Sequence, residues 1–161
     1  MVLKLDTINT KEWGRQDKWD VRFRTGQGPE GYTEWLPATN VSNPLYNISD
    51  YGWSSGHRTF SIPKASDYPD ISMTLLDDDK RTIKNYLREW FESMFFEDGG
   101  VQYLSEVVRV LEITPLNLQN EEVETESYIV FPHGSVASVL SSEPGILSYP
   151  VTFKVVGYSR K

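Results

Sequence analysis

Three consecutive acidic residues are the first candidates for chemistry in this sequence. Asp77, Asp78 and Asp79 stand together, and carboxylate oxygens are suitable ligands for hard cations such as Mg²⁺ and Ca²⁺. Three successive positions at a helix start point in different directions, and the spacing of a calcium-binding loop with its central glycine is absent. Side-chain oxygens at a helix start accept hydrogen bonds from free backbone N–H groups. We therefore expect the triplet to cap a helix.

A histidine and a serine form the second candidate. His133 and Ser135 place a base near a hydroxyl, but a catalytic triad also needs a carboxylate that orients the imidazole. The other histidine, His57, is far away in the sequence, and two histidines need further ligands to make a zinc site. The turn Gly26-Gln27-Gly28 lacks the lysine and the following helix of a phosphate-binding loop. We predict no catalytic residue, cofactor site or metal site, and no enzyme.

Length, charge and composition exclude further classes of protein. The chain has 161 residues, 16 basic and 23 acidic, which gives a net charge of −7. This length favours one domain, and the absence of cysteine excludes disulfides and thiolate chemistry. The acidic balance argues against a protein whose main task is to bind phosphates. Apolar runs are short and the first residues lack the features of a secretory signal, so we expect no membrane anchor.

One amphipathic helix is the clearest element that the sequence predicts. Apolar residues recur with helical spacing and are followed by Gly99-Gly100, which ends the pattern. Arg88 and Glu92 lie one turn apart on the opposite, outer face of this helix. The apolar positions are Ile83, Tyr86, Leu87, Trp90, Phe91, Met94 and Phe95.

Most of the remaining chain has the period of two that is typical of strands. Trp19, Val21 and Phe23 alternate with charged residues, and similar short stretches recur to residue 156. We count seven or eight strands around one helix. The predicted fold is α+β and mainly β: an antiparallel β-sandwich or barrel with one long amphipathic helix on its flank. Residues 1–17 are expected to form an N-terminal arm, and residues 18–161 a single domain.

Residues 41–63 are predicted to form a long hairpin. A turn signal at residues 49–52 places Tyr51 and Trp53 at its tip, where wholly buried side chains are not expected. Tryptophan and tyrosine are enriched at protein interfaces, so we expect these two residues to contact a partner. Flat aromatic faces also bind sugar rings, which leaves open a carbohydrate-binding platform made of Tyr46, Tyr51, Tyr68, Trp35 and Trp53.

An acidic stretch precedes a later predicted strand. Glu121, Glu122, Glu124 and Glu126 fall within six residues. Such a stretch is usually a solvated face, and charges on an edge strand also oppose uncontrolled pairing. A functional alternative is a surface that repels nucleic acid.

The order of elements carries more information than any one motif. The C-terminal part reads Tyr128-Ile129-Val130-Phe131-Pro132-His133-Gly134-Ser135-Val136, then Glu143-Pro144-Gly145-Ile146, then Tyr149-Pro150-Val151-Thr152-Phe153-Lys154-Val155. From Trp19 to Tyr158 the sequence resembles the tail-tube protein family of contractile-tailed bacteriophages. The stretch 67–78 resembles the entry from strand to helix in that family, and the helix around Trp90 has the position of its single long helix.

This resemblance implies a structural role in a phage tail. Subunits would form hexameric rings that stack into a channel, through which double-stranded DNA passes without specific binding. The hairpin would contact the next ring through Tyr51, Trp53 and His57, and the outer helix face with Arg88 and Glu92 would face the sheath. The candidates for charge in the channel are Glu121, Glu122, Glu124 and Glu126.

The expected partners are other copies of the chain, sheath proteins and baseplate proteins, in a virion assembled in the host cytoplasm. Two alternatives remain open at this point. One is a tube-like baseplate or tail-end protein of the same fold. The other is an aromatic-rich carbohydrate-binding β-sandwich.

Overall fold

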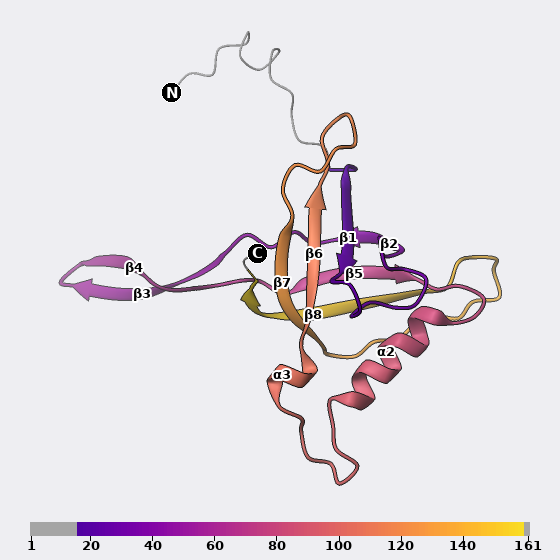
Figure 1. The fold of residues 1–161 in the computed structure, drawn as a ribbon. Helices are drawn as coiled ribbons and strands as arrows, with labels where there is room; N and C mark the ends of the chain where they lie inside the picture. Colours follow the sequence, from indigo (N-terminus) through magenta and orange to yellow (C-terminus); the bar gives the residue numbers. More distant parts are fainter. Residues whose placement is uncertain (1–15, 160–161) are drawn as a thin grey trace.

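The computed structural model describes residues 16–159, which include eight strands and two helices (Figure 1). Apart from residues 16 and 17, the predicted N-terminal arm lies outside the described residues. The elements in chain order are β1 (Trp19–Phe23), β2 (Ala38–Val41), β3 (Asn47–Ser55), β4 (Arg58–Asp67), β5 (Ile71–Leu76), α2 (Thr82–Ser93), α3 (Leu104–Val107), β6 (Arg109–Pro115), β7 (Glu126–His133) and β8 (Ser148–Tyr158).

Six of the strands form one antiparallel sheet that curls into a nearly closed barrel. Its order is β1-β6-β7-β8-β5-β2, so the first two strands in sequence form its two edges. The Leu36 N–H donates to the Val21 carbonyl at 2.8 Å and ties the segment before β2 to β1. β1 and β2 nevertheless form no ladder with each other, and the barrel stays open at this seam. The predicted fold class, mainly β with one long flanking helix, is confirmed.

The hydrophobic core lies between one face of this sheet and α2. Alternate residues of the strands point into it, as the period of two requires. Trp90 lies near its centre, with its ring centroid 5.5 Å from that of Phe23 and 5.7 Å from that of Phe153. Its indole N–H donates to the Val107 carbonyl at 2.7 Å, which satisfies the polar atom that burial would otherwise isolate.

The start of α2 confirms the predicted capping role for Asp77 and Asp78, two of the three residues of the acidic triplet. The Thr82 N–H donates to Asp78 Oδ1 at 2.9 Å, and the Ile83 N–H donates to Asp77 Oδ1 at 3.1 Å. The helix ends at Ser93, earlier than the predicted stop at Gly99-Gly100. After the helix the chain forms a loop, in which the Phe96 N–H donates to the Gly100 carbonyl at 2.7 Å.

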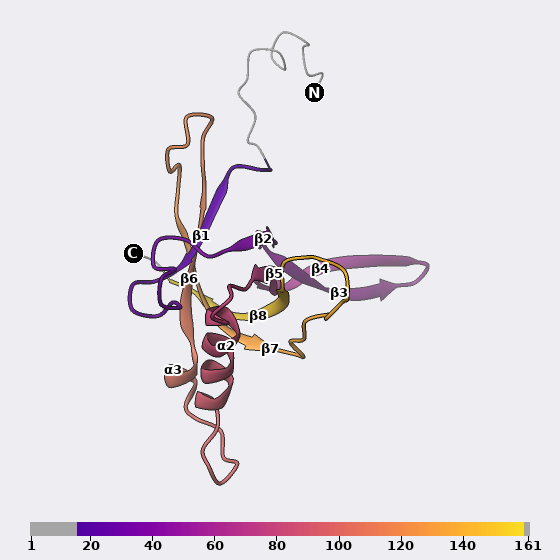
Figure 2. The ribbon, with the colours of Figure 1, turned by 90° about the vertical axis from the view of Figure 1, so that its right-hand side faces the viewer.

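The hairpin of β3 and β4 is a separate two-stranded sheet that projects away from the barrel (Figures 1 and 2). A hairpin was predicted here, but the predicted tip is wrong. Tyr51 and Trp53 lie within β3, and the chain turns at Gly56 and His57. Gly56 has a φ of +63°, which glycine adopts without strain at the first position of a two-residue turn.

Candidate assembly surfaces

The projecting hairpin has one apolar face and one polar face. Tyr51 lies opposite Ile62, and Trp53 lies opposite Phe60. Since side chains alternate along a strand, these four share one face. The opposite face carries mainly small and polar residues: Asp50, Gly52, Ser54, Thr59 and Ser61.

The apolar face of the hairpin is exposed to solvent. The exposed fractions are 59% for Tyr51, 51% for Trp53, 45% for Phe60 and 53% for Ile62. The rings of Trp53 and Phe60 stack with centroids 5.7 Å apart, which holds both in a fixed orientation. Contiguous exposed apolar surface of this kind is typical of a protein–protein contact site. Every residue of both strands is exposed, so the hairpin has no core of its own.

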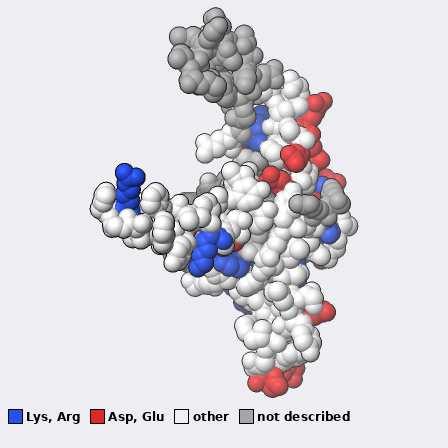
Figure 3. Space-filling model, turned by 90° about the vertical axis from the view of Figure 1, so that its left-hand side faces the viewer, with Lys and Arg blue, Asp and Glu red and all other residues white. Residues whose placement is uncertain are grey.

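The charge of the hairpin differs from that of the whole chain. β3 and β4 together carry Arg58, Lys64, Asp50 and Asp67, so the hairpin is neutral overall, although the net charge of the protein is −7. The two acidic residues lie toward the barrel, whereas Arg58 adjoins the turn. Basic side chains are visible at the end of the hairpin, and acidic ones gather at the lower end and at the upper right of the molecule (Figure 3). His57, a predicted contact residue, lies in the turn and is exposed.

A cluster of tyrosines fixes the root of the hairpin on the barrel. The ring of Tyr68 lies 5.6 Å from that of Tyr46, 5.7 Å from that of Tyr128 and 6.0 Å from that of Tyr158. The Tyr128 hydroxyl lies 2.7 Å from Glu126 Oε2, and burial together with this carboxylate raises the pKa of Tyr128 above its ordinary value. The hydroxyl therefore stays protonated and can donate to this carboxylate.

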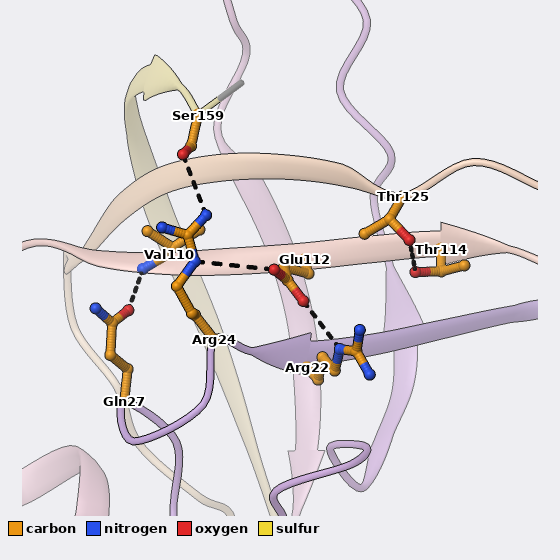
Figure 4. A network of polar contacts seen from close by, with 8 residues as sticks. All are labelled: Arg22, Arg24, Gln27, Val110, Glu112, Thr114, Thr125 and Ser159. Atoms are coloured by element: carbon orange, nitrogen blue, oxygen red, sulfur yellow. Dashed lines mark hydrogen bonds and ion pairs between the residues drawn. The ribbon is translucent and has the colours of Figure 1, made fainter. Parts of the chain in front are cut away.

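The second surface is the face of the sheet that points away from α2 (Figure 4). Glu112 on β6 is only 7% exposed, and Arg22 Nε donates to its Oε2 at 2.9 Å. Arg24 Nε lies 3.9 Å from Oε1 of the same carboxylate. A buried carboxylate is tolerated when it is paired and hydrogen-bonded in this way. Thr114 and Thr125 form a further hydrogen bond of 3.0 Å on this face, which is therefore polar.

The predicted acidic residues lie at one end of this sheet rather than along a strand. Glu121, Glu122 and Glu124 are exposed in the connection between β6 and β7, and Glu126 is the half-buried first residue of β7. Residues 121–125 belong to no strand of the sheet: Glu122 forms only an isolated bridge with Leu116, and a turn that ends at Asn120, with a φ of +63°, precedes them. The exposure of residues 121–124 agrees with the interpretation as a solvated face. Whether these carboxylates face a channel stays a prediction.

The remaining predicted residues are distributed over separate surfaces. Arg88 and Glu92 are both exposed on α2, away from its buried positions. Of the aromatics considered for a sugar platform, Trp53 contacts Phe60, Trp35 contacts Tyr32, and Tyr46 belongs to the cluster at the hairpin root. These rings do not form one continuous platform.

Phe60 and Ile62 are contact candidates that the sequence analysis did not single out. Phe60 and Ile62 are spaced two residues apart on β4, as Tyr51 and Trp53 are on β3. This spacing was the feature of the sequence that could have identified them as contact residues. His133 also has a partner that sequence spacing does not indicate, since its Nε2 lies 2.7 Å from Asp70 Oδ2. Lys154 Nζ lies 3.3 Å from the other oxygen of Asp70. Hydrogen bonds from these two groups hold the pKa of Asp70 below its ordinary value despite some desolvation.

Two further properties concern chemistry and membranes. Among residues 16–159, no group of three or more histidine, aspartate or glutamate side chains is arranged to hold a metal ion. Within the same range, neither helix is long and apolar enough to span a bilayer.

The sequence matches no protein-family model and no curated protein. Among solved structures, a chain of the anti-feeding prophage cap (AFP tube terminating cap) has a TM-score of 0.65 and 18% identity, with 95% of this chain and 93% of that chain covered. A chain of the PVC sheath/tube terminator, from an extracellular contractile injection system in the extended state, has a TM-score of 0.67 and 16% identity, with 93% and 97% covered. The PVC sheath-tube complex in the extended state contains a chain with a TM-score of 0.61 and 17% identity, with 98% and 97% covered. The protein therefore shares its fold, over nearly its whole length, with chains in structures of contractile injection systems.

Proposed function

We propose that this protein is a structural subunit of a contractile-tail tube, in which identical copies form hexameric rings that stack around a channel. The observation that carries this proposal is the projecting hairpin, whose apolar face is exposed along its length. A two-stranded hairpin is at best marginally stable by itself in water. A neighbouring copy that covers this face would supply the missing packing, and the shared fold with chains of tube-containing assemblies supports this role.

The open seam of the barrel supports the formation of rings. β1 and β2 are edge strands, and edge strands present backbone groups that can pair with another chain. Pairing of β1 in one copy with β2 in the next would be a head-to-tail contact, and such contacts close into a ring when the rotation allows it. The sheets of all copies would then form one continuous barrel.

In this arrangement each surface of the subunit would face a different part of the assembly. The polar face with Glu112 and its arginines would line the channel, because α2 covers the other face of the sheet. The outer face of α2, with Arg88 and Glu92, would contact a sheath, and baseplate proteins would bind at one end. With a net charge of −7 on the chain, double-stranded DNA would pass without specific binding. Assembly in the host cytoplasm and location in the tail follow from this role.

A tail-end protein of the same fold is the second candidate. Two of the similar structures reported above contain a tube terminator or terminating cap. Such a protein would form the same ring, but only one of its two ring faces would receive another ring. The difference concerns the number of stacked rings and not the fold of the subunit.

Measurement of the assembly state tests the proposal. Purified protein is examined by light scattering after size-exclusion chromatography, and by negative-stain electron microscopy, over a range of concentrations. Stacked tubes are expected for a tube subunit, and single or paired rings for a tail-end protein. Monomers at every concentration and salt condition would contradict both. Calorimetric titration with a panel of glycans serves as a control, for which no binding heat is expected.

A further inference from the structure

An apolar groove lies where the end of α2, the loop after it, α3 and the end of β7 meet. Its volume is about 550 Å³. Phe95, Val101 and Leu104 line it and are exposed, while Met94 and Val107 form buried parts of its wall. The groove is lined mainly by apolar side chains from segments that are distant in sequence, as protein and ligand contact sites commonly are.

The chain around this groove is acidic. Residues 89–108 contain five acidic side chains and no lysine or arginine. Acidic side chains also gather at the end of the molecule that carries the loop between α2 and α3 (Figure 3). An occupant with a basic surface would therefore be favoured over an acidic one. The acidic residues are Glu89, Glu92, Glu97, Asp98 and Glu106.

The hairpin of this same chain has the complementary properties. Its apolar face, formed by Tyr51, Trp53, Phe60 and Ile62, is exposed, as the groove lining is in part. Its outer part, residues 51–62, carries Arg58 and no acidic residue, whereas Asp50 and Asp67 lie nearer the barrel. The outer part of the hairpin and the chain around the groove thus have opposite charge, and both expose apolar side chains.

A chain does not place its own hairpin in its own groove. The nine paired positions of β3 and β4 form a continuous ladder with one bulge, which keeps the hairpin extended. In two perpendicular views the hairpin and the α2–α3 end project from the barrel in different directions (Figures 1 and 2). Contact between these two surfaces therefore requires two copies of the chain, and it is head-to-tail because the surfaces differ.

We propose that the groove beside α2 and α3 receives the hairpin of a second copy of this chain. This inference rests on the proposed function, since it names the surface that the hairpin contacts in the assembly. The apolar face of the hairpin packs on Phe95 and Leu104, and Arg58 lies against the acidic loop. The occupant is a second copy rather than an unrelated protein, because both complementary surfaces belong to the same sequence.

Chemical cross-linking tests which surfaces meet. The chain has no cysteine, so single cysteines can be introduced without a background reaction. Ile62→Cys on the hairpin and Leu104→Cys in the groove are made in separate chains, which are mixed, assembled and treated with a short bismaleimide. We expect a product of twice the chain mass that forms in the mixture and in neither variant alone. Val139→Cys, an exposed position outside both surfaces, replaces Leu104→Cys as the control and gives no such product.

A charged substitution measures how much the groove contributes. Leu104→Glu places a carboxylate in the apolar contact, and we expect the concentration for half-assembly to rise about tenfold or more. Val139→Glu is the matched control and leaves this concentration unchanged. Circular dichroism confirms that both variants are folded.

The outcomes separate this inference from the proposed function. Assembly of the parent protein without the Ile62–Leu104 cross-link, and without an effect of Leu104→Glu, would overturn the groove contact while rings and tubes still support the proposed function. A parent protein that stays monomeric at all concentrations would overturn both.

Discussion

The six-stranded sheet and the β3–β4 hairpin are built from the same kind of antiparallel pairing, but they differ completely in burial. In β5 every second residue is buried, and Ile71, Met73 and Leu75 pack into the core. In β3 and β4 every residue is exposed, including Trp53 and Phe60. Both regions have paired strands, but only the six-stranded sheet buries its apolar side chains within the chain.

This difference shows that a pair of strands needs apolar burial in addition to the hydrogen bonds between its backbones. The sheet buries its apolar face against α2, which is long enough to cover several strands. The hairpin projects away from α2 and α3, the helices found among residues 16–159 (Figure 1). Since net hydrogen-bond energies in water are small, apolar contact has to come from another molecule if the hairpin is to be held firmly. Two matched tryptophan substitutions and one helix-cap substitution test this distinction.

Trp90→Ala is expected to have the largest effect on folding. It removes a nearly fully buried side chain that packs on Phe23 and Phe153, and it leaves the Val107 carbonyl without its donor. We expect the free energy of unfolding to fall by about 3–5 kcal/mol, measured by urea denaturation of the monomer. A loss below about 1 kcal/mol would show that the core around α2 is not packed as described.

Asp78→Ala is expected to have an intermediate and pH-dependent effect. Hydrogen bonds from the Thr82 backbone and hydroxyl hold the pKa of Asp78 below its ordinary value of 3.8. A carboxyl with a lowered pKa in the folded state stabilises the fold above its ordinary pKa, and loses that contribution as pH falls through the lowered value. The parent should therefore have a higher Tm than Asp78→Ala near neutral pH, and this difference should shrink below pH 3.8.

Asp79→Ala is the control for the cap, because Asp79 is the exposed neighbour in the same acidic triplet. Thermal unfolding of all three proteins between neutral and acidic pH gives the comparison. Equal Tm values for the parent and Asp78→Ala near neutral pH would contradict the capping role.

Trp53→Ala is expected to have the smallest effect on folding and a large one on assembly. The side chain is half exposed and contacts Phe60, so the free energy of unfolding of the monomer should change by less than about 1 kcal/mol. If Trp53 is an interface anchor, the concentration for half-assembly should rise about tenfold or more, as measured by light scattering. Thr59→Ala, on the polar face of the same hairpin, should change neither quantity. A strongly destabilised monomer would instead show that Trp53 packs within its own chain.

Local patterns predicted the elements well where one periodicity dominated. The apolar spacing from Ile83 to Trp90 identified α2, and the alternation at Val21 and Phe23 identified β1. The turn of the hairpin was misplaced because Asp50 and Gly52 have the composition of a turn, whereas pairing with β4 extends β3 through them to Ser55. Pairing with β4 therefore had more influence on this segment than the turn preference of Asp50 and Gly52.

The contact surfaces could be predicted only in part. Tyr51 and Trp53 were recognised from their residue type, but their partners Phe60 and Ile62 became evident from the cross-strand register. The groove could not be foreseen, because its lining combines residues near 91–107 with residues 131–134. Nothing in the local sequence indicates that these two segments meet.

By itself, the sequence determined the identity of the long helix, most strand positions, the absence of thiol chemistry and the presence of a hairpin rich in aromatics. These are properties of short windows, where side-chain spacing and backbone preference act directly. Only the tertiary structure decided the strand order β1-β6-β7-β8-β5-β2, the open seam between the first two strands and the exposure of one hairpin face. Those features depend on which distant segments pair and which apolar surface remains uncovered after the core is filled, and no single window contains that information.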